Sequence, residues 1–358
     1  MESEINSMAE LVHGIEPPSE EWHQEARQHL DTLTKPLGSL GRLEDIAAQV
    51  AAIRREHFSD SVSKAVYVFA ADHGITEEGV SAYPREVTRQ MVLNFLAEGA
   101  AINVLARQHR AALHVVDVGV DANFGSMLGL LHRKVRSGTR NMLREAAMNR
   151  EEVEKALNIG YRLGSEAAAA GHTIVAIGEM GIGNTTAASA ITCALTGAAA
   201  TLATGRGTGV EPAAYANKVR VVEAVVAKHC NSSDAPQPHE ILRRLGGLEI
   251  AAMAGMVLAG AKHRLVVVLD GFISTAAAAV AVAMAPNALG YLIAGHQSEE
   301  PGHKLLLDHL QLTPVLSLGM RLGEGTGAVL AMGVIESATA LYHQMATFTS
   351  AGVSEATQ

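Results

Sequence analysis

A glutamate between two glycines near the C-terminal end is the residue whose surroundings most suggest chemistry. Residues 321–328 read RLGEGTGA, which places Glu324 between Gly323 and Gly325. Glycines let a ligand approach the backbone closely, and the apolar stretch 329–341 predicts a helix that begins just after Glu324. The helix dipole would favour the ionised carboxylate, whereas burial would raise its pKa. A proton-accepting base and a helix-capping glutamate both remain open.

Two glycine-rich segments indicate an anion site. Residues 178–186 (GEMGIGNTT) follow a β-branched run and lead into an Ala-rich helix, whose first N–H groups would attract a phosphate. A tight strand-to-helix turn is the alternative. Asn184 stands where a Walker A loop requires lysine, which disfavours an NTPase. Residues 205–209 (GRGTG) are a weaker second loop, and Lys218 could either reach the same phosphate or lie on the surface.

Carboxylates and histidines near predicted strand ends have less specific interpretations. Asp72 and Asp270 each end a strand, where an aspartate could hold ribose hydroxyls or cap the next turn. His296 and His303 have no third partner at a metal-binding spacing, and the two cysteines are also not spaced for a metal. We therefore expect no metal.

Short apolar runs alternate with helix-like segments along the chain. Five runs predict strands that helices cover on both faces, at residues 65–72, 113–120, 173–178, 264–270 and 289–295. Between them, Asn149 with Glu152 is typical of a helix N-cap pair. This alternation predicts an α/β fold with a doubly wound, mostly parallel sheet and helices on both faces. Ligands of such sheets bind outside the carboxyl ends of the strands.

The two ends of the chain lack evident strands and have helical patterns. We expect residues 1–60 with 314–358 to form a smaller helical domain that caps a large Rossmann-like catalytic domain at 61–313. A length of 358 residues exceeds the usual size of one domain.

Composition narrows the class of protein. A net charge of −9 argues against a sequence-independent nucleic-acid binder, and a charged fraction of 18% favours an oligomer. The N-terminus has no apolar signal core. The weakly polar stretch 276–285 is too short for a membrane span, which takes about 20 residues. We expect a cytoplasmic protein.

These segments together resemble the nicotinate-nucleotide–dimethylbenzimidazole phosphoribosyltransferases. The matching motifs run in order through nearly the whole chain, at residues 34–44, 71–75, 79–88, 90–92, 178–186, 205–209, 246–253, 296–298 and 321–328. One departure is Glu98, where the family pattern has a second glycine. We expect this change to affect a helix turn rather than the chemistry.

The resemblance implies a reaction. Nicotinate mononucleotide would donate ribose 5-phosphate to 5,6-dimethylbenzimidazole, giving nicotinate and α-ribazole 5′-phosphate, the nucleotide of the cobalamin lower ligand. Glu324 would be the general base that takes the imidazole proton while the other ring nitrogen attacks C1′ with inversion. The nucleotide carries its own positively charged leaving group, so the resemblance implies no cofactor and no metal. It also implies a homodimer.

The resemblance also assigns roles to individual residues. Glu179 would lie beside the reacting sugar as a second catalytic residue. The nucleotide and its phosphate would be held by Gly181, Gly183, Asn184, Thr185, Thr186, Gly207, Thr208, Lys218 and Asp270. The benzimidazole pocket would be lined by Ser81, Tyr83, Gln90 and Met180.

Two other function classes compete with this interpretation. An NAD-dependent oxidoreductase is suggested only by the α/β pattern with glycine loops, and residues 71–74 (ADHG) after the first strand are not a dinucleotide fingerprint. A catalytically idle nucleotide-binding protein would not require the two glutamates, Glu179 and Glu324.

Overall fold

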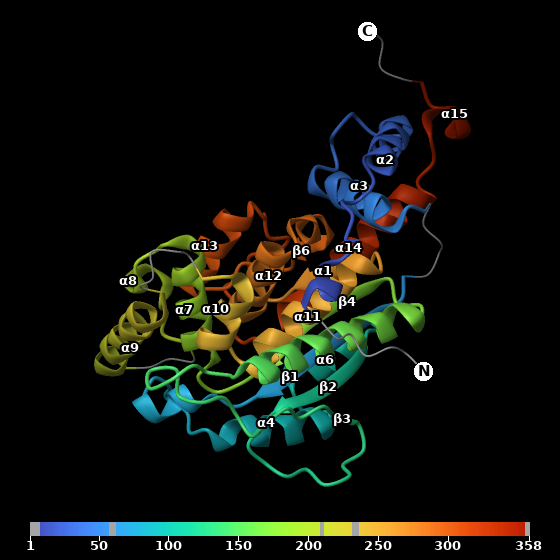
Figure 1. The fold of residues 1–358 in the computed structure, drawn as a ribbon. Coiled ribbons are helices and arrows are strands. Elements are labelled where there is room, and N and C mark those ends of the chain that lie inside the picture. The colour runs from blue at the N-terminus through green and yellow to red at the C-terminus, as the bar shows by residue number, and fades with distance from the viewer. Residues whose placement is uncertain (1–7, 57–61, 208–210, 231–235, 355–358) are drawn as a thin grey trace.

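A six-stranded sheet with only parallel strand pairs forms the centre of the computed structural model (Figure 1). The structure describes residues 8–56, 62–207, 211–230 and 236–354. The strands are β1 (Lys64–Ala71), β2 (Ala112–Gly119), β3 (Leu130–His132), β4 (Ile174–Met180), β5 (Val266–Leu269) and β6 (Leu292–Ala294). Their order is β3-β2-β1-β4-β5-β6. The predicted doubly wound α/β fold is confirmed, and a crevice is expected where the order reverses, between β1 and β4.

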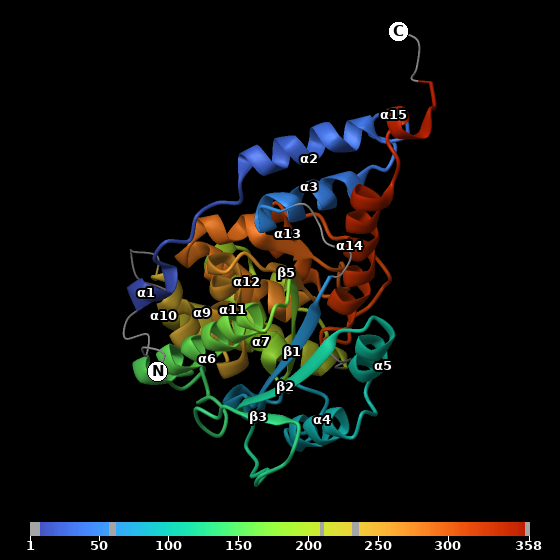
Figure 2. The ribbon, with the colours of Figure 1, turned by 90° about the vertical axis from the view of Figure 1, so that its right-hand side faces the viewer.

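Five of these strands correspond to the predicted runs, and β3 was not predicted. All eight residues of β1 are buried, because helices cover both faces of the sheet (Figure 2). On one face lie α6 (Arg150–Ala169), α11 (Leu248–Lys262) and α12 (Phe272–Met284). On the other lie α5 (Ala101–Gln108) and α14 (Thr326–Gln344).

The remaining helices lie in the connections between these elements and around the two helix layers. They are α1 (Met8–Val12), α2 (Glu20–Thr32), α3 (Arg42–Arg54), η1 (Gly74–Glu78), α4 (Glu86–Leu96), α7 (Asn184–Thr196), α8 (Ala200–Ala203), α9 (Pro212–Cys230), α10 (Pro238–Leu245), η2 (Pro286–Tyr291), α13 (Pro301–Leu310) and α15 (Phe348–Ala351). Among the helices of the described ranges, none combines the length and apolar character that a membrane crossing requires.

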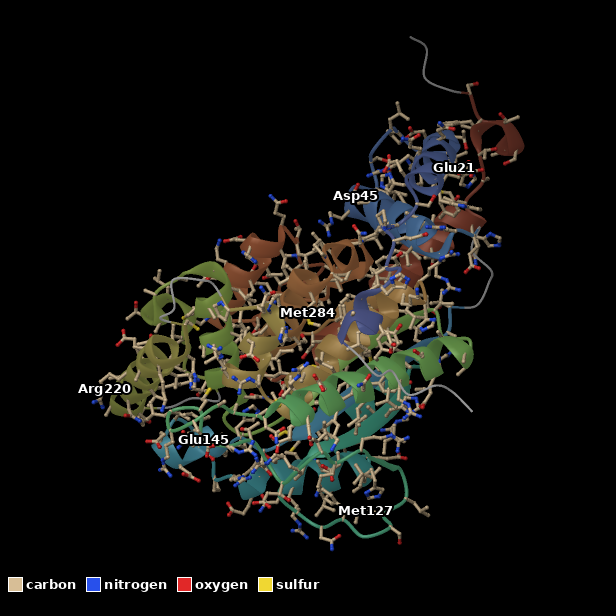
Figure 3. The ribbon with its side chains drawn as sticks, in the orientation of Figure 1. Glu21, Asp45, Met127, Glu145, Arg220 and Met284 are labelled. Carbon is tan, nitrogen blue, oxygen red and sulfur yellow. The ribbon has the colours of Figure 1, made fainter. Side chains whose placement is uncertain are left out.

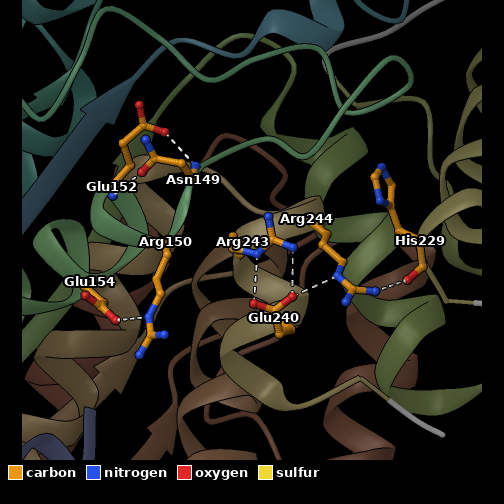
Figure 4. Close-up of polar contacts among 8 residues, drawn as sticks. All are labelled: Asn149, Arg150, Glu152, Glu154, His229, Glu240, Arg243 and Arg244. Atoms are coloured by element: carbon orange, nitrogen blue, oxygen red, sulfur yellow. Dashed lines mark hydrogen bonds and ion pairs between the residues drawn. The ribbon is translucent and has the colours of Figure 1, made fainter. Parts of the chain in front are cut away.

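Local polar contacts fix several helix ends (Figure 4). The predicted N-cap pair is confirmed, because Asn149 and Glu152 exchange reciprocal side-chain to backbone hydrogen bonds at the start of α6. On α10, Glu240 accepts hydrogen bonds from Arg243 and Arg244. Arg244 also donates to the carbonyl of His229, which ties α10 to α9.

The two chain ends meet at one end of the molecule, where α2, α3, α15 and the last turns of α14 lie together (Figures 1 and 2). Leu33 forms an antiparallel bridge with Thr347. Glu21 and Asp45 lie at this end, whereas Arg220 of α9 lies at the opposite one (Figure 3). In contrast, α1 contacts α6 and α11. The division into two domains stays a prediction, and its boundary at 60/61 falls outside the described residues.

Candidate active site

Two adjoining cavities open at the carboxyl ends of the strands. The walls of the first come from the ends of β4 and β5, the starts of α7 and α12, and three loops around residues 207, 296–300 and 321–323. The second shares Gly181, Ile182, Asn184, Thr185 and Gly207 with the first and adds Ser81, Gly183 and Lys218. Their place at the carboxyl ends is where doubly wound sheets bind ligands.

Most of the predicted site residues line one of these cavities. The first contains Glu179, Met180, Gly181, Asn184, Thr185, Gly207 and Asp270, and the second adds Ser81, Gly183 and Lys218. Four predicted residues of the described chain are not part of either lining: Tyr83, Gln90, Thr186 and Glu324. Thr186 is buried in the first turn of α7, whereas Tyr83 and Gln90 are exposed. Thr208 lies outside the described residues. The roles of all these residues stay predictions.

The first glycine loop is shaped for close approach to the backbone. β4 ends at Met180 and α7 begins at Asn184, with Gly183 as N-cap at φ 96°, a left-handed conformation that glycine adopts without strain. A side chain at Gly181 would come within 2.5 Å of the carbonyl oxygen of Ala71. The Ile182 N–H donates to Thr88 Oγ1 over 3.1 Å. The N-terminus of α7 is therefore held facing the cavity, as an anion site requires.

Lys218 brings a buried positive charge to this loop. It is 1% exposed, so the alternative of a surface lysine is wrong. Its Nζ donates to Thr185 Oγ1 over 2.9 Å and to the carbonyl of Gly205 over 3.2 Å. Burial lowers its pKa to about 8, so it is still mainly charged at pH 7. Both glycine loops thus meet at one cation.

Glu179 is an unusual carboxyl near the end of β4. It is 8% exposed and accepts a hydrogen bond from the side-chain amide of Asn184. Burial raises its pKa to about 8, and the nearby carboxylates of Asp270, Glu249 and Glu324 add to that rise. At neutral pH this carboxyl is therefore mainly protonated and can donate a hydrogen bond as well as accept one.

Glu324 lies on a strained turn directly after the Gly323 wall of the first cavity. Gly323, Glu324 and Gly325 have φ angles of 88°, 63° and 93°, and a left-handed glutamate costs about 1–2 kcal/mol. Its side chain is buried, and Oε2 accepts the N–H of Ile102 over 3.3 Å. The helix whose start it contacts is therefore α5 rather than α14. Burial raises its pKa more than the Ile102 N–H lowers it.

Asp270 does not cap the turn that follows it, which was one of its two interpretations, but the start of a helix 55 residues further along the chain. Its carboxylate accepts the N–H groups of Gly325, Gly327 and Ala328 at 2.7–3.1 Å, at the start of α14. It also lines the first cavity, so a role in nucleotide binding stays a prediction. Asp72 likewise accepts the N–H of Asp121 over 2.7 Å.

His296 and His303, which the sequence offered as a metal pair, each contact protein side chains or backbone instead. His296 Nε2 lies 3.7 Å from Asp270 Oδ1. His303 contacts Ser298 N and Thr275 Oγ1, and burial lowers its pKa to about 3, which keeps the ring neutral. Within the described ranges, no group of three His, Cys, Asp or Glu side chains could hold a metal ion.

Three polar residues at the site were given no role by the sequence. Glu300 and Arg321 line the first cavity, and Arg321 donates to the carbonyl of Gly207 over 3.1 Å. Glu249 lies beneath the glycine loop, 2.5 Å from His73 Nε2, and both side chains are buried. Arg321 and Glu249 both stood within matching motifs, at 321–328 and 246–253, whereas Glu300 lies just outside the motif 296–298 and reads as an ordinary helix-start glutamate.

Comparison with known proteins gives one consistent family. A family model described as phosphoribosyltransferase matches residues 15–353. A protein of Geobacter sulfurreducens is 51% identical over 348 residues, 97% of this chain and 98% of the relative. One of Chloroflexus aggregans is 47% identical over 354 residues, 98% of this chain and 99% of the relative. Both are named nicotinate-nucleotide–dimethylbenzimidazole phosphoribosyltransferase. The crystal structure of CobT from Thermus thermophilus matches with a TM-score of 0.90 and 47% identity, covering 94% of this chain and all of that one.

Proposed function

The chain belongs to the nicotinate-nucleotide–dimethylbenzimidazole phosphoribosyltransferase family, and from that premise we propose that it transfers ribose 5-phosphate from nicotinate mononucleotide to 5,6-dimethylbenzimidazole. The products are α-ribazole 5′-phosphate and nicotinate. Near-full-length identity of 51% to a relative of that name carries the proposal. The two cavities at the carboxyl ends of the strands support it, whereas nothing in the family match supports the oxidoreductase alternative.

Glu324 is the proposed general base. It takes the proton from one imidazole nitrogen while the other attacks C1′ from the side opposite nicotinate, which inverts the anomeric carbon. Its raised pKa supports this role, because burial makes the carboxylate a stronger proton acceptor. A positioned general base contributes typically about 10²–10⁴-fold.

Glu179 is the proposed partner of the sugar. It lies at the end of β4 between the glycine loop and Gly323. As a mainly neutral carboxyl it would bind a ribose hydroxyl without placing a second full charge beside Asp270. Asp270 in turn fixes the turn that carries Glu324, since it caps α14.

The phosphate end of the nucleotide is proposed to lie on the 181–186 loop. Lys218 supplies the charge, and Thr185 and Gly207 bound the same space. The reaction needs no metal or cofactor, because the pyridinium of nicotinate mononucleotide leaves as a neutral ring nitrogen.

The benzimidazole is proposed to bind beside Ser81 and Met180, with Tyr83 and Gln90 at the rim. We also propose a homodimer in the cytoplasm. Exposed leucines support an assembly, because Leu318 and Leu322 are 58% and 55% exposed and Leu322 lines the first cavity.

The decisive experiment is a direct assay. Purified protein is incubated with nicotinate mononucleotide and dimethylbenzimidazole in the presence of EDTA, and α-ribazole 5′-phosphate and nicotinate are quantified by chromatography. Equal amounts of the two products are expected. Absence of product, or product only when phosphoribosyl pyrophosphate replaces the mononucleotide, would contradict the assignment.

A further inference from the structure

Glu300 is a buried carboxyl where the phosphate of the nucleotide is proposed to bind, and the proposed reaction assigns it no role. It is the N-cap residue of α13, is 6% exposed and lines the first cavity together with Gly207 and Arg321. A side chain at Gly205 would collide with its Oε2, so the carboxyl lies directly against the second glycine loop. An acid is unexpected in a pocket for an anion.

One oxygen of this carboxyl has no partner. The Gly207 N–H donates a hydrogen bond to Glu300. In the described part of the chain, Oε2 is buried and makes no hydrogen bond. A buried carboxylate oxygen without a donor is costly, whereas the same oxygen carrying a proton could donate to a ligand in the cavity.

The charges around Glu300 are few. Lys218 of α9 and Arg321 of the loop before α14 attract its carboxylate, and neutral His303 lies on α13 itself. Glu179, Asp270 and His296 are further titratable groups of the same cavity. Burial raises the pKa of Glu300, although Lys218 and the Gly207 N–H oppose the rise. Without a ligand, the carboxylate therefore serves as counter-ion to the two cations.

A phosphate dianion in this space would meet two cations and one anion. Repulsion between dianion and carboxylate favours protonation of the carboxylate. We propose that Glu300 takes up one proton when a phosphate monoester dianion binds, and that the neutral carboxyl then donates a hydrogen bond to the phosphate. The proton comes from solvent, and no covalent bond of the phosphate changes. The uptake removes the repulsion that a doubly charged monoester would otherwise meet at this carboxylate, and a singly charged diester requires less of it.

This inference rests on the proposed function, because the phosphate is that of nicotinate mononucleotide. The test measures protons taken up on binding, by calorimetric titration at pH 7 in two buffers of different ionisation heat, without acceptor base. One ligand is nicotinate mononucleotide, and the other is its 5′-phosphate methyl ester, which carries one phosphate charge. Any protons that Glu179 takes up or releases in response to the pyridinium are the same for both ligands and cancel in the comparison. Lys218, with a pKa of about 8, adds at most about 0.1 proton.

The wild type is expected to take up about 0.5–1 proton more with the monoester than with the diester. Glu300→Gln, which keeps the size and removes the titration, should abolish this difference. Glu299→Gln is the matched control, because Glu299 is the exposed neighbour of Glu300, and it should retain the difference. Above pH 7, KM for the mononucleotide should rise more steeply in the wild type than in Glu300→Gln, by up to about tenfold per pH unit.

Equal proton uptake with both ligands by the wild type would overturn the inference. So would a difference that survives in Glu300→Gln. If Glu300→Gln does not fold, the two ligands on the wild type decide alone. If the diester does not bind, the comparison of wild type and Glu300→Gln with the monoester decides. Failure of nicotinate mononucleotide itself to bind would instead contradict the proposed function.

Discussion

Two turns close to the start of α5 each hold a glutamate in the left-handed conformation. One precedes α5 in the chain, and the other precedes α14 but contacts α5 through its glutamate. In the turn 97–99, Glu98 has a φ of 59°, its side chain is 73% exposed, and it forms an ion pair with Arg107 over 3.0 Å. In the turn 323–325, Glu324 has a φ of 63°, is 5% exposed and accepts the N–H of Ile102 in the first turn of α5. Backbone strain is similar, but the surroundings of the two carboxylates differ.

The difference indicates at which of the two glutamates the strained backbone is tied to function. Glu98 stands where the family pattern has glycine, and its side chain reaches only a surface partner. Glu324 is flanked by two glycines that fit the turn, so glycine would also relieve its strain, yet a carboxylate is present. Strain that persists at a buried carboxylate beside a cavity is typical of functional sites.

The largest expected effect tests the buried turn. Glu324→Gln should lower kcat by at least ~10² with little change in nucleotide affinity, because the amide fits the turn but accepts no proton. Steady-state turnover and calorimetric binding measure the two effects. Glu98→Gln should leave both unchanged. Loss of nucleotide binding in Glu324→Gln would instead indicate a positioning role.

The packing of the buried turn is tested by a second variant. A side chain at Gly323, where φ is 88°, would collide with Glu179 Oε1. Gly323→Ala should therefore cost about 2–4 kcal/mol of unfolding free energy, measured by urea denaturation. Gly319→Ala is the matched control, because φ is 66° there and the nearest atom lies 3.9 Å away. Similar losses in the two variants would show that backbone strain alone is responsible.

Glu179 of β4, whose side chain lies against Gly323 of the buried turn, should make stability depend on pH. Between pH 4.5 and about 8, Glu179 ionises in the unfolded chain but keeps its proton in the folded one, so it lowers stability progressively as pH rises. Glu179→Gln should remove this loss. Its unfolding free energy relative to wild type should increase by about 4 kcal/mol from pH 4.5 to pH 8. Parallel stability curves of the two proteins over that range would contradict this expectation.

The smallest effect is expected in the exposed turn. Glu98→Gly should raise the unfolding free energy by about 0.5–1 kcal/mol, since relief of left-handed strain exceeds the entropy that glycine loses on folding. Arg107→Ala removes the surface ion pair but leaves the left-handed glutamate, so it measures the contribution of the pair alone, about 0.2–1 kcal/mol. Activity should not change in either variant. A destabilised Glu98→Gly would mean that the ion pair outweighs the strain.

The sequence predicts the sheet well because buried parallel strands are continuous β-branched runs. It misses β3, which has only three residues, Leu130–His132, and whose last residue is exposed. Strand ends then direct attention to Asp72 and Asp270, because ligands of such sheets gather there.

Contacts between distant segments are what the sequence does not predict. The partner of Glu324 is Ile102, 222 residues away. The capping of α14 by Asp270 follows only once β5 and that turn lie together. Glu249 and Glu300 stand at helix starts, where glutamate is ordinary. The motif 246–253 contains Glu249 but gives it no role, so the burial of both side chains in the fold is what draws attention to them.

One helix joins the cavity to the far end of the molecule. α14 has 19 residues and is therefore about 28 Å long. Its start is fixed by Asp270, and α3 packs against it. One inserted residue would turn the two ends by about 100° and move them apart by about 1.5 Å. Evolution can therefore change the length of this chain in exposed loops such as 121–129, but not within 326–344 without losing one of the two attachments.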